Sequence, residues 1–313
     1  MTAFWRDRAA PGRRRGWRLA LALCAAIASV WVFVVVLMLA LESTFLYFPA
    51  RTLDAQPRDY GLASDEVRLT ASDGVRLHGW WLRGRGDRAL VWFHGNAGNI
   101  SHRLDNAKRL IDRFGLDILL VDYRGYGLSE GTPDESGLYR DGLAMYDEAA
   151  RRGFAPSRIV LFGRSLGAAV AVEVALQRPH AALILETPFL SVPAMARVHY
   201  PFVPKALIRS RFDLEAKIAS VQGPILVLHG DRDEIVPLAQ ARRVFELARP
   251  PKRFYLIRGA GHNDTYVVGG EEYFRVWGEF LGRGRLRPPE PERSRCAAGP
   301  RAARGAAASP AGS

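Results

Sequence analysis

The sequence contains very little cysteine, only Cys24 and Cys296 in 313 residues. One lies in a long apolar segment and the other in a C-terminal tail, so a disulfide framework is excluded. No group of histidine, cysteine and aspartate residues has the spacing of metal ligands. No Walker or dinucleotide-binding loop follows the first strand-like segment. We therefore expect neither a metal nor another cofactor.

Charge is scarce in the central part of the chain, although the formal net charge is +12. Residues 1–18 hold six arginines and one aspartate, and residues 283–313 hold seven arginines and two glutamates. Residues 19–282 therefore carry only +2. A nearly neutral centre excludes a broad basic face, so we expect no nucleic-acid partner. The tail has almost no large apolar residue and is expected to be disordered.

Charge is absent from Leu19 to Leu41, a run of 23 residues. At a rise of about 1.5 Å per residue, such a helix crosses a hydrocarbon core of ~30 Å. The arginines before it predict a cytoplasmic N-terminus, with everything after residue 42 on the other side, which is the periplasm in a bacterium. A cleaved signal peptide is the alternative. The run exceeds the usual length of about 7–15 residues and lacks a clear small-x-small site, so we favour an uncleaved anchor.

The region from residue 65 to 281 alternates between strand and helix patterns. Apolar strand-like runs occupy 66–69, 75–82, 88–93, 117–121, 158–162, 182–185, 224–228 and 253–257. Helical patterns occupy 100–114, 136–151, 166–178, 238–248 and 271–281. This order predicts an α/β domain in which helices cover both faces of a mostly parallel sheet.

One turn indicates a reaction class. The sequence Gly163-Arg164-Ser165-Leu166-Gly167 follows a strand-like run and precedes a helical run, which is the context of a nucleophile elbow. The stretch Gly127–Gly131 has the same glycine and serine spacing around Ser129, but a polar loop follows it instead of a helix. We therefore predict that Ser165 is the nucleophile and that Ser129 is a loop residue.

A serine nucleophile needs a base, and the base needs a carboxylate. His262 follows the last predicted strand on a glycine-flanked loop and is the candidate base. Asp231 and Asp233 both follow the strand at 224–228, in the chain order Ser…Asp…His, and either fits the acid on the residues alone. The backbone N–H groups of Leu166 and Asn96 are the candidate oxyanion donors.

Five polar, glycine-rich segments follow the predicted strands, at the edge where parallel sheets form their sites. They are His94–Asn99, Asp122–Gly127, Gly163–Gly167, His229–Asp233 and Gly261–Asp264. Over about residues 45–282 this set resembles the α/β-hydrolase superfamily. The branch that it resembles comprises membrane-anchored abhydrolase-domain serine hydrolases, the bud-emergence-homologue group and its bacterial relatives.

The resemblance implies an α/β-hydrolase fold and, by the family's HG-x-x-D pattern, Asp233 as the triad acid. Asp231 is then a local turn residue. The implied organisation is a basic cytoplasmic N-terminus (1–18), a transmembrane anchor (19–41), a hydrolase domain (45–282) and a tail (283–313).

Residues 187–211 occupy the place where such hydrolases insert a lid, and four prolines limit this lid to one or two short helices. Four of its apolar residues could line an acyl groove or could simply cover the sheet; they are Phe189, Tyr200, Phe202 and Ile208.

The predicted function is a membrane-anchored serine hydrolase of carboxylic esters or thioesters, with a substrate that is lipid-like or membrane-associated. Two alternatives remain open on the sequence. One is a non-catalytic, membrane-anchored binding protein with the same fold. The other keeps the triad but cleaves amides or catalyses a cofactor-free peroxidation, because these reactions share the same residues.

Overall fold

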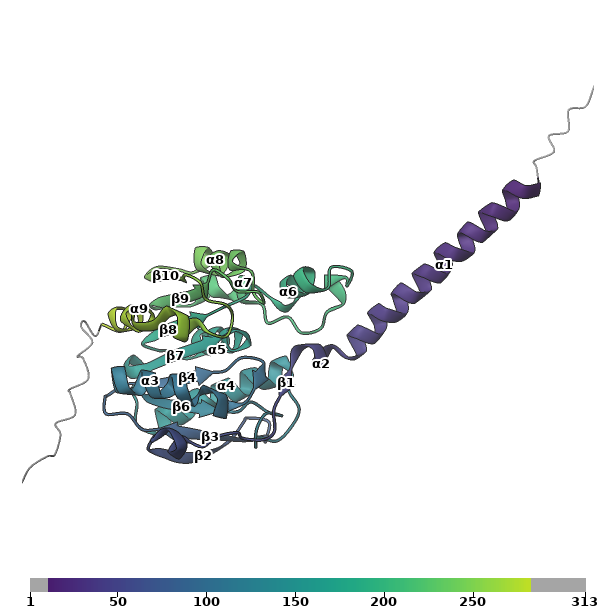
Figure 1. Cartoon of the computed structure of the whole chain (residues 1–313). Coiled ribbons are helices and arrows are strands. Elements are labelled where there is room, and N and C mark those ends of the chain that lie inside the picture. The colour runs from purple at the N-terminus through teal and green to yellow at the C-terminus, as the bar shows by residue number, and fades with distance from the viewer. Residues whose placement is uncertain (1–10, 283–313) are drawn as a thin grey trace, which may run out of the picture.

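The computed structural model describes residues 11–282 as a globular domain from which one long helix projects (Figure 1). That helix, α1 (Pro11–Ala40), contains the expected anchor. The tail from residue 283, with its expected disorder and with Cys296, lies outside the described residues. The same is true of residues 1–10 of the basic N-terminus.

An eight-stranded sheet in the order β10-β9-β8-β7-β4-β6-β3-β2 forms the centre of the domain. Its strands are β2 (Ser64–Thr70), β3 (Arg76–Leu82), β4 (Ala89–Phe93), β6 (Asp117–Val121), β7 (Ile159–Arg164), β8 (Ala182–Glu186), β9 (Ile225–Gly230) and β10 (Lys252–Ile257). Only the β2–β3 and β3–β6 pairs are antiparallel. All eight predicted strands are present, and the sheet is mostly parallel as predicted.

Both faces of the sheet are covered because its central strands are buried and mostly apolar. In β4, Val91 and Phe93 belong to one core, whereas Leu90 and Trp92 belong to the other. The first core packs under α4 (Glu135–Arg151), α5 (Leu166–Gln177), α7 (Leu214–Lys217) and α8 (Leu238–Leu247). The second packs under α3 (Leu104–Phe114) and α9 (Thr265–Phe280). This is the layer order that the alternating pattern predicts.

Short elements that the sequence pattern did not indicate lie between α1 and the sheet edge. Helix α2 (Glu42–Leu46) follows α1 directly, and β1 (Phe48–Pro49) then pairs in parallel with β5 (Ala97–Gly98). The lid contains α6 (Val192–His199) and a single 3-10 turn (Lys205–Leu207), as its length and prolines predicted. Further 3-10 turns are Pro57–Tyr60, Ile100–Arg103, Pro156–Arg158 and Ile218–Ser220.

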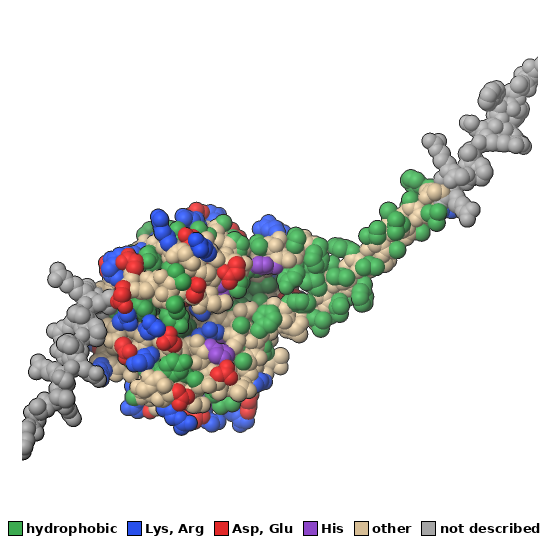
Figure 2. All heavy atoms as spheres, viewed as in Figure 1, with side chains coloured by type: hydrophobic (Ala, Val, Ile, Leu, Met, Phe, Trp, Pro, Cys, Tyr) green, Lys and Arg blue, Asp and Glu red, His purple; other side chains and the backbone are tan. Residues whose placement is uncertain are grey.

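The segment Gly16–Ala40 of α1 is 25 residues long and apolar enough to cross a membrane. At about 1.5 Å per residue it is about 37 Å long, which exceeds a hydrocarbon core of ~30 Å. Large side chains such as Trp17, Leu19 and Phe33 are exposed along it. Figure 2 shows an apolar rod that leaves the charged surface of the domain. A signal sequence near an N-terminus would have the same length and composition.

Candidate active site

Ser165 lies on a sharp turn between β7 and α5 and has a backbone φ of 52° and ψ of −119°. Such angles are unfavourable for a residue with a Cβ, so the surrounding contacts must hold the serine in place. Two glycines permit those contacts. A Cβ on Gly163 would lie 2.4 Å from the carbonyl oxygen of Gly167, and one on Gly167 would lie 2.0 Å from that of Phe93. The predicted elbow is therefore present, because β7, α5 and the end of β4 approach too closely for side chains.

His262 is hydrogen-bonded to Asp233, with Nδ1 and Oδ2 2.8 Å apart. The other carboxylate oxygen of Asp233 accepts from the backbone N–H groups of Ile235 (2.9 Å) and Val236 (2.8 Å). Burial alone would raise the pKa of Asp233, but the hydrogen bonds from His262 and Val236 hold it below its usual value. Asp233 is therefore an ionised carboxylate that orients the imidazole, with Nδ1–H as the donor.

Asp231 has a different environment from Asp233. Its Oδ1 accepts from the backbone N–H of Gly259 at 2.6 Å, a bond that joins the loop after β9 to the loop after β10. Asp231 thus has a structural role, but it joins two loops instead of stabilising a turn within its own loop as expected. His229, two residues earlier, is fully buried, and its Nε2 lies 3.0 Å from the carbonyl oxygen of Val236. Burial lowers the pKa of His229, so a neutral ring supports the loop that carries Asp233.

The segment of Asn96 is fixed beside the elbow by contacts from three directions. Its carbonyl oxygen accepts from Phe48 N (2.9 Å) and Tyr126 Oη (2.8 Å), and its Nδ2 donates to Leu46 O at 3.0 Å. In residues 11–282, neither Asn96 N nor Leu166 N donates to a backbone carbonyl. Both residues line the same cavity as Ser165. Two free donors beside the serine are what an oxyanion hole requires.

The loop that carries Asn96 begins with His94, which is fully buried. Its Nδ1 lies 2.7 Å from Gly95 O, and its Nε2 lies 3.4 Å from Tyr123 N. Burial lowers the pKa of His94 to about 3, so the ring is neutral and supports the loop. The role expected for it, shaping this loop, agrees with these contacts.

A second buried network supports the loop of His262, and sequence reasoning missed it. Glu186, at the end of β8, is fully buried and accepts from Thr265 Oγ1 (2.8 Å) and Tyr273 Oη (2.6 Å). Its Oε1 lies 3.0 Å from Nε of Arg164, whose Nη2 donates to His262 O at 2.6 Å. Arg164, the residue before Ser165, is thus connected both to Glu186 and to the backbone of His262. An ion pair between the ends of adjacent strands has no signature in a single sequence.

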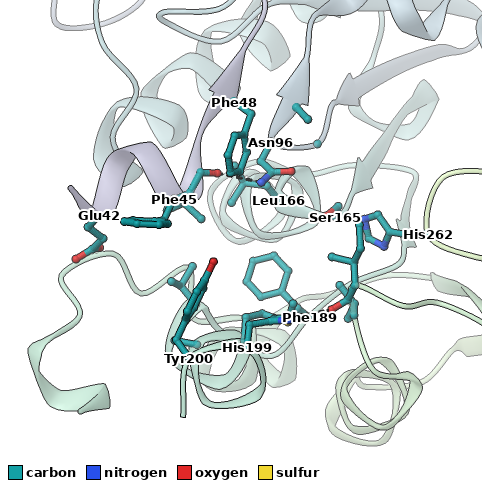
Figure 3. Close-up of a pocket in the computed structure, with 18 of the residues that line it drawn as sticks. Glu42, Phe45, Phe48, Asn96, Ser165, Leu166, Phe189, His199, Tyr200 and His262 are labelled. Carbon is teal, nitrogen blue, oxygen red and sulfur yellow. Dashed lines mark hydrogen bonds between the residues drawn. The ribbon is translucent and has the colours of Figure 1, made fainter. Parts of the chain in front are cut away.

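A cavity of about 460 Å³ opens in front of Ser165 and His262 (Figure 3). Three of the four residues expected in an acyl groove line it: Phe189, Tyr200 and Ile208. Phe202 does not. It lies in the turn after α6 and is 45% exposed, and Val203 lines the cavity instead. The expectation for Phe202 was wrong because α6 ends at His199, and in the turn that follows Tyr200 and Val203 line the cavity whereas Phe202 is exposed.

The cavity also has a wall that the sequence did not indicate. Met38 and Leu39 at the end of α1, and Glu42, Phe45 and Leu46 of α2, line it opposite the lid. Apolar residues at the end of an apparent anchor look like the rest of the anchor, so no pattern could have distinguished them.

The remaining candidates lie elsewhere. Ser129 is buried, donates from Oγ to Asp122 O at 2.6 Å and accepts from His78 N at 2.9 Å, as a structural loop residue does. Among the described residues there is no cluster of three or more histidine, cysteine, aspartate or glutamate side chains that could hold a metal ion.

Comparison with known proteins places this chain in a family. The profile of a family described as serine aminopeptidase, S33, matches residues 84–211. An uncharacterized protein of Mycobacterium tuberculosis, Rv2307c, is 38% identical over 267 residues, which cover 84% of this chain and 95% of that protein. The α/β hydrolase domain-containing protein WAV2 of Arabidopsis thaliana is 34% identical over 79% of this chain and 89% of its own length.

Two further similarities agree with these. Protein bem46 of Schizosaccharomyces pombe is 31% identical over 74% of this chain and 81% of its own length. A solved structure of the Pyrococcus furiosus esterase Pf2001 superposes with a TM-score of 0.64 over 76% of this chain and 98% of that one, at 21% identity, which is a likeness of fold. The strand order, the elbow and these relatives together establish that the chain belongs to the α/β-hydrolase family.

Proposed function

We propose that this protein is a serine hydrolase that cleaves carboxylic esters or thioesters through an acyl-enzyme on Ser165. The observation that carries the proposal is the 2.8 Å hydrogen bond between His262 and Asp233, which share a site with a serine held on a strained turn. A neutral serine hydroxyl is a weak nucleophile, and an oriented imidazole is what activates it.

In the proposed mechanism, Ser165 Oγ attacks the acyl carbon while its proton passes to Nε2 of His262. The carbonyl oxygen becomes an oxyanion between the N–H groups of Asn96 and Leu166. Collapse breaks the bond to the leaving alcohol or thiol, which takes the proton from Nε2. Water then attacks the acyl carbon while His262 takes its proton. Collapse of this second intermediate releases the carboxylic acid, and His262 returns the proton to Ser165 Oγ. Asp233 stays ionised and stabilises the imidazolium in each half-reaction.

The experiment that tests this function is active-site labelling of the full-length, detergent-solubilised protein with a fluorophosphonate probe. We expect one covalent adduct per chain and its loss in Ser165→Ala. A panel of esters, thioesters and amides with equal acyl groups then ranks the leaving groups. Because the matching family is described as serine aminopeptidase, cleavage of amides is the alternative that this panel tests. A folded wild type that is neither labelled nor active on any of these substrates would favour a non-catalytic binding role.

We also propose that Gly16–Ala40 anchors the enzyme in a membrane, with its N-terminus in the cytoplasm and its catalytic domain on the other side. The exposed apolar surface of α1 and the arginines before it support this arrangement. The mass of the mature protein in the membrane fraction tests it. An intact N-terminus is expected, whereas a chain shortened by this segment would identify a signal sequence.

A further inference from the structure

The cavity at Ser165 lies between the anchor and the lid and not inside the globular domain alone. Met38 and Leu39 of α1 and Phe45 of α2 form one side, whereas residues of α6 and the turn after it form the other. Figure 3 shows Phe45 and Tyr200 approaching each other across the opening. Their ring centroids are 6.0 Å apart in an edge-to-face arrangement. The helix that resembles a plain membrane anchor thus supplies part of the binding site.

A polar contact fixes the lid to this wall. The two carboxylate oxygens of Glu42 accept from the backbone N–H groups of Arg209 (3.0 Å) and Ser210 (2.7 Å). Glu42 is the first residue of α2, so the position of the lid depends on where α1 ends. The width of the cavity opening between α1 and the lid therefore depends on the position of α1 as well as on the globular domain.

The lid has an unusual surface for a water-exposed segment. Val198, Tyr200, Phe202 and Leu207 are 37–49% exposed. Residues 187–211 also hold four basic side chains and no acidic one; they are Arg197, Lys205, Arg209 and Arg211. None of these four forms an ion pair within the described part of the chain, and all are exposed. Because residues 19–282 carry +2 in all, the rest of that region is slightly negative.

Exposed aromatic and aliphatic side chains mixed with unpaired cations are typical of a protein surface that rests on an anionic lipid interface. Here that surface belongs to the lid, which forms one side of the cavity, and Figure 2 shows apolar side chains gathered where the domain meets the base of α1. With α1 in the bilayer, the opening faces the lipid headgroups. Apolar side chains then continue from the hydrocarbon core, along α1, to Ser165.

We propose that the substrate is a long-chain acyl ester of the bilayer itself, whose acyl chain enters between the end of α1 and the lid. This inference rests on the proposed function and adds the substrate class and the direction of access. Each methylene of an acyl chain that passes through water raises the free energy of its transfer from the bilayer to Ser165. This penalty grows with chain length. A continuous apolar path removes the penalty for a long chain and gives little advantage to a short one.

The test measures kcat/KM of the full-length protein in vesicles that contain anionic phospholipid. The two substrates are a palmitoyl ester in the bilayer and a water-soluble butyryl ester with the same leaving group. In Leu39→Trp a larger side chain narrows the cavity between α1 and the lid. We therefore expect the ratio of palmitoyl to butyryl kcat/KM to fall by roughly tenfold or more. Leu37→Trp is the matched control, because Leu37 lies on the same helix, is 45% exposed and does not line the cavity.

A second variant tests the lid surface. Glutamine at the four basic positions leaves the cavity wall intact, because none of the four lines it. We expect butyryl turnover in detergent to be retained and palmitoyl turnover in anionic vesicles to fall severalfold. The salt dependence of palmitoyl turnover should also become weaker.

Equal substrate ratios for Leu39→Trp and Leu37→Trp, or unchanged palmitoyl turnover in the glutamine variant, would overturn the inference while butyryl hydrolysis persists. A wild type that hydrolyses neither ester would instead overturn the proposed function on which the inference depends.

Discussion

Replacing Ser165 with alanine should lower kcat for an ester substrate by about 10⁶-fold, because the acyl-enzyme can no longer form. The measurement is steady-state turnover of the butyryl ester by the purified full-length protein, normalised to folded protein. The serine occupies a backbone geometry that alanine can also adopt, so the fold should persist. Residual turnover would come from the oxyanion donors and substrate binding alone.

Ser129→Ala is the control for this prediction, because Ser129 has the same glycine spacing around it. Its hydroxyl links Asp122 O to His78 N in the interior, so its loss should lower the melting temperature. Turnover per folded molecule should stay close to wild type. A large loss of turnover in Ser129→Ala with an intact fold, or retained turnover in Ser165→Ala, would contradict the assignment of the nucleophile.

Asp233→Asn should lower kcat by about 10⁴-fold while the protein remains folded. An amide at this position would donate to Nδ1 of His262 instead of accepting from it. The ring would then carry its proton on Nε2 and could not accept the proton of Ser165. The negative charge that stabilises the imidazolium would be lost as well. Turnover of the butyryl ester and the melting temperature, measured together, separate this effect from unfolding.

Asp231→Asn removes the same charge two residues away and is the matched control. Asp231 contacts Gly259 N and not His262, so we expect a modest loss of stability and little change in kcat. Similar losses in the two variants would mean that the loop as a whole, and not the carboxylate of Asp233, controls the reaction.

The strands were predictable because each is a short apolar run between turn residues. The run at 88–93 became β4, Ala89–Phe93, and the run at 117–121 became β6 with the same bounds. Helix α9 was predicted only from residue 271, whereas it begins at Thr265. Gly270 has a φ of 51° inside it and interrupts the helical pattern at that point. Strands β1 and β5, with two residues each, are too short to show any periodicity.

The sequence by itself determined the fold class and the candidates for the reactive side chains, because both depend on local patterns. A glycine-flanked serine between strand and helix, and a histidine after the last strand, need only neighbouring residues to be recognised. The residues alone left Asp231 and Asp233 as alternatives, since both follow the same strand, and only the resemblance to a family pattern favoured Asp233. The 2.8 Å contact between Asp233 and His262, 29 positions away, agrees with that choice.

Only the tertiary structure decided what surrounds Ser165. In the sequence, Met38 and Glu42 resemble the end of an anchor and Arg209 belongs to the lid segment. In the structure, Met38 and Glu42 line the cavity, and Glu42 accepts a hydrogen bond from the backbone of Arg209. Such contacts join segments more than 160 residues apart and leave no periodic pattern in either segment. The candidate reactive groups could therefore be recognised in the sequence, whereas the shape of the cavity depends on the packing of α1, α2, the lid and the sheet edge.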